Sequence, residues 1–271
     1  MSTDLLLRSR LASRRCVRAA ALGAALALLA LGPGRVEGQL LTACAGEVST
    51  PELLSGCANA IRGLEGVRDG IGVGHAGASA LPGSASALGR RFGSTPRFAV
   101  AGRIGMVRFD RADPDSWTTR APRSGWAPVF AAQAGIGVFD GFSLAPTVGG
   151  VLAVDVLTDI STLRLPSDDG FDGASLAWGY GVRIGLLRES FTLPGASVSI
   201  LRRGGVSFRQ EGTEGFLDAD VTTTSIRATL GKEVLGFGVH GGAGWDHVSA
   251  EGTLQVTPAG APGPAVDFSG E

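Results

Sequence analysis

The chain has 271 residues, of which 43 are glycine, and its net charge is −1. Glycine is more than twice its usual share, and no long stretch repeats apolar residues every three to four positions, which excludes a mainly helical protein. The balanced charge gives no indication of a nucleic-acid-binding surface.

An export signal occupies the first part of the chain. Five arginines precede an apolar run from Ala19 to Leu31. The run is shorter than the ~20 apolar residues of a membrane-spanning helix, and Val36-Glu37-Gly38 supplies small residues for a cleavage site. We expect a signal peptide at 1–38 and a mature chain from about Gln39, with an uncleaved signal anchor as the alternative. The arginines are Arg8, Arg10, Arg14, Arg15 and Arg18.

The cysteine content agrees with export. Cys16 lies in the signal peptide, which leaves Cys44 and Cys57 in the mature chain. We predict a disulfide between them, because such bridges persist in the oxidising periplasm, and closing this loop is worth about 3 kcal/mol. Two alternatives stay open. The cysteines are two free buried thiols, or Leu41-Thr-Ala-Cys44 is a lipoprotein box with Cys44 lipidated.

One short helix is predicted near the start of the mature chain. Ser49-Thr50-Pro51-Glu52 combines capping residues, an early proline and an acid in the first turn. Apolar residues from Leu54 to Leu64 share one face, so we expect a helix at about 51–65. The glycine-, alanine- and serine-rich stretch from Gly66 to Pro96 has no apolar period and predicts an extended, plug-like lead-in. Helix and lead-in would form a periplasmic region at 39–96, followed by a β domain at 97–271.

From Arg97 onward, apolar and small or polar residues alternate with the period of two that is typical of β-strands. In the clearest segment, Ser175 to Leu186, one face carries only large apolar side chains. Such strands are longer than those of soluble sheets and long enough to cross a bilayer when tilted. Seven segments show the pattern: 98–107, 126–139, 148–162, 175–186, 196–208, 220–231 and 236–246.

The connections between these segments are also predicted to alternate in length, as in transmembrane barrels with short periplasmic turns and long outer loops. The predicted long connections are 110–125, 163–173, 209–219 and 251 onward, and the short ones are 140–147, 188–195 and 232–235. Aromatic residues near the strand ends would form two interfacial girdles. These are Trp126 and Phe208 on the long-loop side, and Phe139, Phe142, Phe191 and Phe237 on the short-turn side.

Three stretches of the chain resemble uncharacterised bacterial outer-membrane β-barrel proteins: Gly70 to Phe98, Leu187-Arg-Glu-Ser-Phe-Thr-Leu-Pro-Gly195 and Val234-Leu-Gly-Phe-Gly-Val-His-Gly-Gly-Ala-Gly-Trp245. The resemblance covers about 66–256. It implies an all-β, antiparallel up-and-down transmembrane barrel of about 8–12 strands in the bacterial outer membrane, and it transfers no catalytic residue. Two features depart from the pattern. Tyr180 is the single tyrosine, and the carboxyl end, Phe268-Ser-Gly-Glu271, lacks the terminal aromatic strand that the barrel-assembly machinery recognises.

Closure adds a further expectation, because in hydrocarbon every strand edge must be paired. Bacterial single-chain barrels have an even number of strands, whereas seven segments are visible here. After the seventh segment only a Pro-, Gly- and Ala-rich loop and a short tail remain. We therefore expect a C-terminally incomplete chain, in which Val266 to Glu271 is disordered or begins an eighth strand. The strand at 98–109 would then lack its closing neighbour, and the sheet would stay open.

Two motifs suggest ligand binding, but the surrounding sequence supports neither. Gly72-Val-Gly74-His-Ala-Gly77 has the spacing of a dinucleotide fingerprint, yet no strand precedes it and Pro82-Gly83 would stop any helix after it. The loop Asp168-Asp-Gly-Phe-Asp-Gly173 could gather carboxylates around calcium. An EF-hand loop, however, needs an acid where Gly179 stands. We predict no cofactor and no metal.

Catalysis would require a histidine within reach of a nucleophile and an acid. His240 and Asp246 share a face but lie about 20 Å apart along a strand at the standard rise. We therefore predict a non-enzymatic protein. A barrel-scaffold lipid hydrolase that uses His240 is one alternative, and a secreted soluble β-sandwich binding protein is another.

Seven polar residues are predicted to face the lumen. They have two interpretations: they line a pore for small solutes, or they form a closed ion-pair network in a narrow barrel. The closed network is favoured slightly, because arginines opposite an acid neutralise a lumen more readily than they build a selective constriction. The function predicted is that of a passive pore or structural envelope component whose partners are outer-membrane lipid and the assembly machinery. The seven residues are Arg103, Gln133, Asp155, Arg183, Arg203, Arg227 and His240.

Overall fold

The structure is a computed structural model that describes residues 50–76, 98–113, 115–117, 123–143, 149–172, 174–191, 193–234, 237–257 and 265–270. The predicted signal peptide, Cys44 and most of the predicted lead-in lie outside these residues. Within them, no helix is both long and apolar enough to cross a bilayer.

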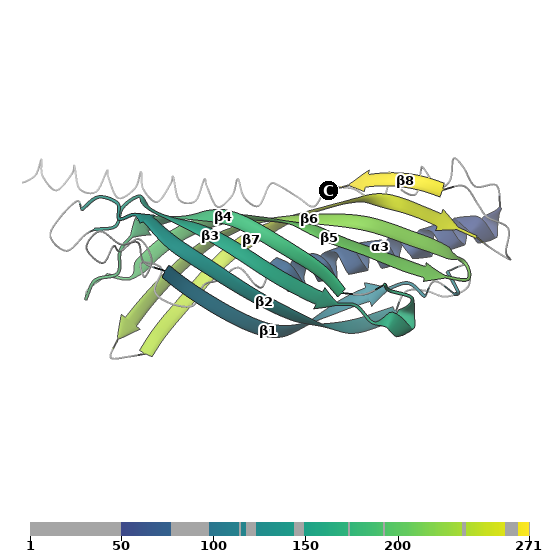
Figure 1. The fold of residues 1–271 in the computed structure, drawn as a ribbon, viewed down its shortest axis with the longest axis horizontal. Helices are drawn as coiled ribbons and strands as arrows, with labels where there is room; N and C mark the ends of the chain where they lie inside the picture. Colours follow the sequence, from purple (N-terminus) through teal and green to yellow (C-terminus); the bar gives the residue numbers. More distant parts are fainter. Residues whose placement is uncertain are drawn as a thin grey trace, which may run out of the picture. The chain divides into compact units, whose positions relative to one another are not determined.

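One helix precedes a single antiparallel sheet in which each strand pairs with the next along the chain (Figure 1). The predicted helix and up-and-down strand order are confirmed. A second sheet, which a sandwich requires, is absent from the described part of the chain. The elements are α3 (Pro51–Ala76), β1 (Phe98–Arg111), β2 (Arg123–Phe139), β3 (Ala153–Arg164), η1 (Ser167–Asp169), β4 (Ala174–Leu187), β5 (Gly195–Gly212), β6 (Gly215–Val234), β7 (Phe237–Val256) and β8 (Ala265–Gly270).

The sheet is open, as predicted. In the described residues β1 pairs only with β2, and β8 pairs only with residues 250–255 of β7. The two ends of the sheet differ, so we name them. At the packed end β1 terminates at Arg111 and β7 at Val256, whereas at the far end β1 begins at Phe98 and β7 at Phe237.

The helix is longer than predicted, because α3 continues through glycines that were assigned to the lead-in. These glycines let the helix backbone approach β1 closely. A Cβ at Gly66 would lie 2.4 Å from the carbonyl oxygen of Asp110, and a Cβ at Gly70 would lie 2.4 Å from the Cβ of Phe109. Docking on the sheet therefore outweighs the weak helix propensity of glycine.

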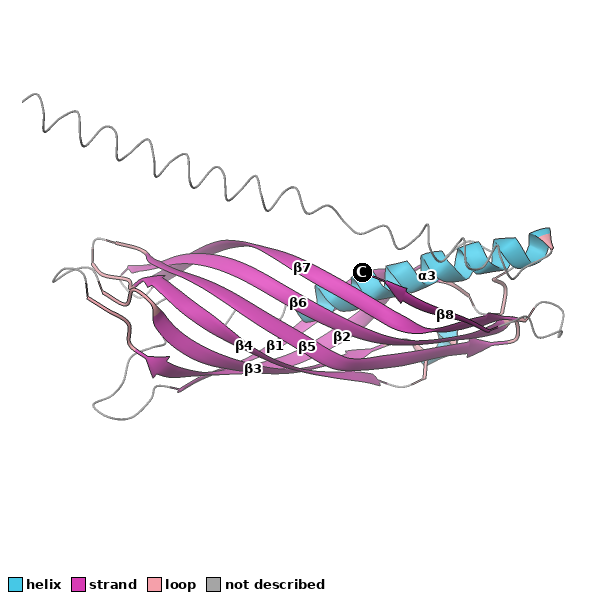
Figure 2. Ribbon diagram, turned by 90° about the horizontal axis from the view of Figure 1, so that it is seen from above, coloured by secondary structure: helices cyan, strands magenta, loops and turns pink. Residues whose placement is uncertain are grey.

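The helix runs antiparallel to β1 and lies along one face of the sheet, which we call the inner face (Figure 2). Gly63 faces Ala112 near the packed end, whereas Gly74 faces Val107 further along β1. On the other side of the helix, Gly72 faces Val248 of β7. The helix thus contacts β1 on one side and β7 on the other.

Several strands extend beyond their predicted bounds, and the predicted alternation of long and short connections is wrong. Residues 209–219 are no loop, because β5 and β6 are joined by the two-residue turn Thr213-Glu214. Conversely, the predicted short connection 140–147 is part of a longer one, 140–152, which separates β2 from β3 by more residues than 112–122 separates β1 from β2. The prediction took this stretch for a loop because it is rich in polar residues. Most of these lie on the outer face of β5 and β6, which continue through the stretch.

The polar face and the apolar face of the sheet change places between the far half and the packed end. In the far half the outer face carries large exposed apolar side chains, among them Val182 and Val239, and the inner face carries polar ones such as Asp155. At the packed end the outer face is polar, with Arg209 and Asp220 exposed. The inner face there is apolar and packs with α3. That core includes Ile61, Leu64, Ile71, Phe109, Trp117, Phe171, Leu217 and Leu254.

A bulge in β5 accompanies this exchange and corrects one prediction. Pairing with β6 shifts between Arg203 and Val206, and Gly205 takes a left-handed conformation at φ +81° that favours glycine. The shift turns Phe208 inward, where it is buried against Phe171. Phe208 is therefore a core residue and no member of a girdle.

Docking of α3 can be tested at Gly70. We expect Gly70→Val to lower the free energy of unfolding by about 1–3 kcal/mol, because the new side chain collides with Phe109. Asp69→Val places the same β-branched residue at an exposed neighbouring position and controls for helix propensity. Denaturant midpoints of both variants give the comparison, and equal destabilisation would contradict the close approach.

Candidate functional site

All seven residues that were predicted to face the lumen occupy inner-face positions of the sheet. Gln133, Asp155, Arg183 and Arg203 are buried, Arg103 and Arg227 are half-buried, and His240 is exposed. His240 lies on the part of β7 that β8 does not reach.

The first ion pair joins neighbouring strands directly. Asp155 of β3 and Arg183 of β4 are opposite each other in register, and Arg183 Nε donates to Asp155 Oδ2 at 2.9 Å. Both side chains are buried. A charge-assisted hydrogen bond in such surroundings is short and strong, and losing either partner would leave an isolated buried charge.

The second ion pair crosses a strand. Arg203 of β5 reaches over β4 to donate from Nε to Asp159 Oδ1 of β3 at 2.7 Å, and from Nη1 to Ser225 Oγ at 3.1 Å. Gly179 stands between Asp159 and Arg203 in the register. A Cβ there would lie 2.8 Å from Arg203 Cγ, so glycine on β4 makes the crossing possible.

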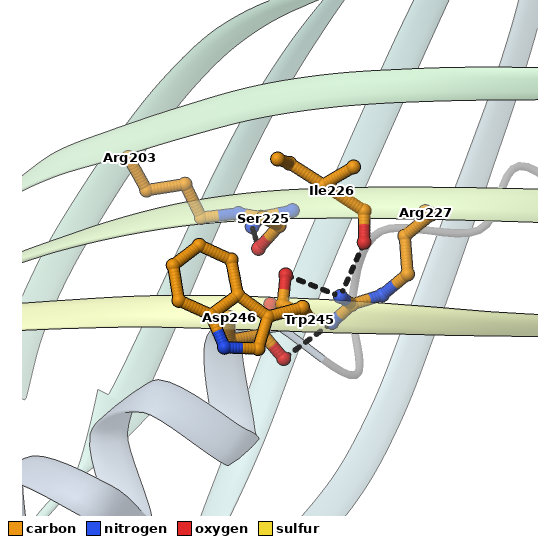
Figure 3. Close-up of polar contacts among 6 residues, drawn as sticks. All are labelled: Arg203, Ser225, Ile226, Arg227, Trp245 and Asp246. Atoms are coloured by element: carbon orange, nitrogen blue, oxygen red, sulfur yellow. Dashed lines mark hydrogen bonds and ion pairs between the residues drawn. The ribbon is translucent and has the colours of Figure 1, made fainter. Parts of the chain in front are cut away.

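The third ion pair joins β6 and β7, and its arginine also lies over a glycine (Figure 3). Both oxygens of Asp246 accept hydrogen bonds from Arg227 Nη2 at 2.6 Å, and Arg227 Nη1 donates to the carbonyl of Trp245. Arg227 lies over Gly244, where a Cβ would come 2.2 Å from Arg227 Cδ. Gly179 and Gly244 thus leave room for arginine side chains to cross the strand.

The helix adds a buried histidine to this face. His75, 1% exposed, shares a 2.6 Å hydrogen bond between its Nδ1 and Ser161 Oγ of β3. Burial, and to a lesser extent the positive charge of Arg203, lowers the pKa of His75 to about 4. The ring is therefore neutral at pH 7, which suits its place beside arginines.

Apolar contact narrows the interior next to the ion pairs. Leu157 of β3 and Leu201 of β5 are buried together, and Ala99 of β1 packs against them. The inner faces of β1, β3 and β5 therefore touch one another. These contacts and the ion pairs occupy part of the inner face of the far half, whereas His240 on β7 is exposed.

Sequence analysis missed three members of this network: Asp159, Ser161 and His75. Asp159 lies four residues after Asp155 on the same face of one strand, so period-two alternation could have identified it. His75 had no such signal, because its stretch was assigned to a linker. Asp246 was placed correctly on the polar face, but its partner is Arg227 and not His240.

The other candidate motifs have structural roles where they are described. Gly72 to Ala76 lies within α3 and not at a helix N-terminus. Asp169 pairs with Arg111, and Phe171 is buried in the core. The described residues contain no group of three or more histidine, cysteine or acidic side chains placed to hold a metal. Cys57 is buried and disulfide-bonded, while its predicted partner, Cys44, lies outside the described residues.

No protein-family model matches the chain, and searches of curated proteins and of solved structures found no significant match. The likeness of 66–256 to outer-membrane barrel proteins stays an expectation from the sequence.

Because Arg203 crosses β4 over Gly179, alanine substitutions at two glycines should differ in their effect on stability. We expect Gly179→Ala to lower the free energy of unfolding by about 1–3 kcal/mol, because the new Cβ displaces Arg203 from Asp159. A Cβ at Gly102 would meet no atom within 4 Å, so Gly102→Ala should be neutral or slightly stabilising. Denaturant titration of both variants measures this difference in stability, and equal effects would contradict the crossing of Arg203 over Gly179.

Burial of His75 predicts a pH dependence. The unfolded chain takes up a proton near pH 6.5 and the folded chain only near pH 4, so stability falls as pH drops through this window. The loss is on the order of 3 kcal/mol. In His75→Gln this part of the pH dependence should vanish. An unchanged slope between pH 6.5 and 4 in the variant would contradict the neutral buried ring.

Proposed function

We propose that this chain is a β-sheet protein of the bacterial outer membrane with a filled interior, and that it is a structural component of the envelope and not an open pore. The observation that carries the proposal is the belt of exposed apolar side chains on the outer face, which we call the apolar band. Its members are Phe98, Val100, Ile104, Met106, Phe130, Val138, Val156, Ile160, Leu176, Trp178, Tyr180, Val182, Ile184, Leu186, Ile200, Leu230, Phe237 and Val239.

The apolar band is continuous over seven neighbouring strands. Trp178 is 59% exposed and Ile104 is 80% exposed, although each is large and apolar. Contiguous patches of this kind on a monomeric protein mark contact with a membrane or a partner. Since the same side chains alternate with buried polar ones, the strands have the apolar-out, polar-in pattern of transmembrane barrels.

The height of the apolar band fits a bilayer. On β4 it runs from Leu176 to Leu186, about 34 Å along the strand at the standard rise. A tilt of 35–45° reduces this to about 24–28 Å, close to the ~25 Å of outer-membrane barrels. Trp126 and Trp178 lie toward the packed end, and Phe139 and Phe142 lie toward the far end. These residues would sit at the two interfaces.

Beyond the apolar band, the outer surface of the packed end is polar and suited to contact with water. Ser207 donates to Asp220, and Thr253 donates to Asp267, all on the outer face. The apolar inner face of this region is covered by α3. The packed end would therefore stand outside the bilayer as a water-exposed extension with its own core.

The filled interior favours a structural role over a pore. Three ion pairs and the Leu157–Leu201–Ala99 contact occupy the inner face of the far half. A conducting pore needs polar groups that remain hydrated, whereas Arg203 and Asp159 are 1% and 0% exposed. The lipid-hydrolase alternative has less support, because Asp246 is engaged by Arg227 and not oriented toward His240.

Membrane insertion can be tested with paired cysteines. In lipid vesicles, Val182→Cys should be protected from a membrane-impermeant maleimide, because Val182 lies in the apolar band. Asp220→Cys, on the outer face of the packed end, should react at least tenfold faster. Urea unfolding should equalise the rates. Similar rates in the folded protein would overturn the membrane assignment.

The closed interior can be tested by conductance. The unmodified protein in a planar bilayer should give no steady unitary currents, because ion pairs fill the interior. Replacing both Arg183 and Arg203 with alanine removes two of the side chains that fill it and should raise the frequency of current events. Stable discrete channels from the unmodified protein would favour the passive pore.

A further inference from the structure

A row of hydrogen-bonding side chains crosses the outer face of β4 to β7. Each member stands opposite the next in the register of the sheet. We call this set the donor row, and its members are Tyr180, Arg202, Thr224 and His247. A phenol, a guanidinium, a hydroxyl and an imidazole can each donate a hydrogen bond to an anion.

On β5 to β7 the donor row marks the change from an apolar to a polar outer surface. On its packed-end side, β6 and β7 continue with Thr222 and Ser249, which are opposite each other. On its far-end side, the next row is entirely apolar and consists of Val182, Ile200, Ile226 and Trp245. Under the proposed membrane location the donor row therefore lies at a boundary between hydrocarbon and head groups.

Arg202 places a positive charge in this row that no neighbouring acid balances. Its side chain is exposed and takes part in no hydrogen bond or ion pair among the described residues. Its two neighbours in the register are uncharged. On β6 and β7 the first outer-face acids are Asp220 and Glu251, each four residues beyond the donor row, about 13 Å along the strand at the standard rise. Arg202 is thus available to an anion at the end of an apolar surface.

A hollow on the same face of the sheet lies in line with the donor row. Its volume is about 690 Å³, within the ~300–1,000 Å³ of typical ligand pockets. Gly241 lines it, and a Cβ there would meet no atom within 4 Å. Ala228 lies four residues from Thr224, about 13 Å, and one leaflet of the ~30 Å hydrocarbon core is about 15 Å deep. An acyl chain that starts at the donor row can therefore reach the hollow. Its apolar outer-face lining is Leu186, Ala196, Ala228, Leu230 and Val239.

We propose that the donor row and the hollow bind an anionic phospholipid, with its phosphate at Arg202 and an acyl chain in the hollow. Arginine suits the phosphate because its planar fork matches two phosphate oxygens. A lipid with a net negative charge is favoured over a zwitterionic one, which carries its own cation. Lys232 also lines the hollow, but its ammonium donates to backbone carbonyl oxygens of the connection between β4 and β5. The inference rests on the proposed membrane location.

The test titrates the full chain in detergent with phosphatidylglycerol or with phosphatidylcholine of the same chain length, and native mass spectrometry counts the bound lipid. Phosphatidylglycerol should bind at least fivefold more tightly than phosphatidylcholine. Arg202→Gln should weaken phosphatidylglycerol binding at least fivefold, because it removes the cation. Arg209→Gln, at an exposed outer-face arginine that pairs with Glu211, should leave binding unchanged.

A second variant tests the hollow separately from the charge. Gly241→Leu fills the hollow but keeps Arg202, and it should also weaken binding at least fivefold while circular dichroism shows intact β structure. Gly102→Leu, at an equally open outer-face position of β1, should bind normally. Equal binding of the two lipids, or undiminished binding by Arg202→Gln or by Gly241→Leu, would overturn the site. If Val182→Cys is protected in vesicles while the lipid preference is absent, the membrane location stands and the phospholipid site falls.

Discussion

An arginine buried on the inner face of this sheet must reach a carboxylate, because an uncompensated charge there would cost several kcal/mol. This constraint explains the positions of two inner-face glycines, Gly179 and Gly244. Arg203 can meet Asp159 only by crossing β4, and Gly179 leaves the room for it. Since the pairs hold the side chains across neighbouring strands, they occupy part of the inner face. Charge pairing and the glycines at Gly179 and Gly244 therefore depend on one another.

The exchange of polarity along the strands follows from the surroundings of each half. Where the outer face is apolar, the inner face can be polar because ion pairs satisfy it. Where the outer face is polar, the inner face is apolar and needs a cover, which α3 supplies through Ile61 and Ile71. The glycines of α3 bring that cover into contact with β1. The helix is thus required by the packed end, and the far half depends mainly on its own ion pairs.

Period-two alternation predicted the parts of the fold in which large apolar and polar side chains contrast strongly. It placed Leu176, Trp178 and Tyr180 on the exposed face of β4 and Arg183 on the buried face, as the structure shows. It failed where polar residues occupy the outer face of continuing strands, as at 209–219, because the same residues are typical of loops. It also could not foresee that α3 would extend through its glycines, since the reason is a tertiary contact with β1. Phe208 was misplaced because a bulge reverses the alternation, and Gly204-Gly205 was its local signal.

The central claim is that the outer face of the far half contacts lipid, and the four tryptophans of the chain provide a direct measurement. Each is kept alone in turn, with the others replaced by phenylalanine, and its fluorescence is recorded in vesicles that contain brominated phospholipids. Trp126 and Trp178, exposed on the outer face, should be strongly quenched, whereas Trp117, fully buried in the packed end, should keep its emission. Equal, weak quenching of Trp178 and Trp117 would contradict a lipid-facing band.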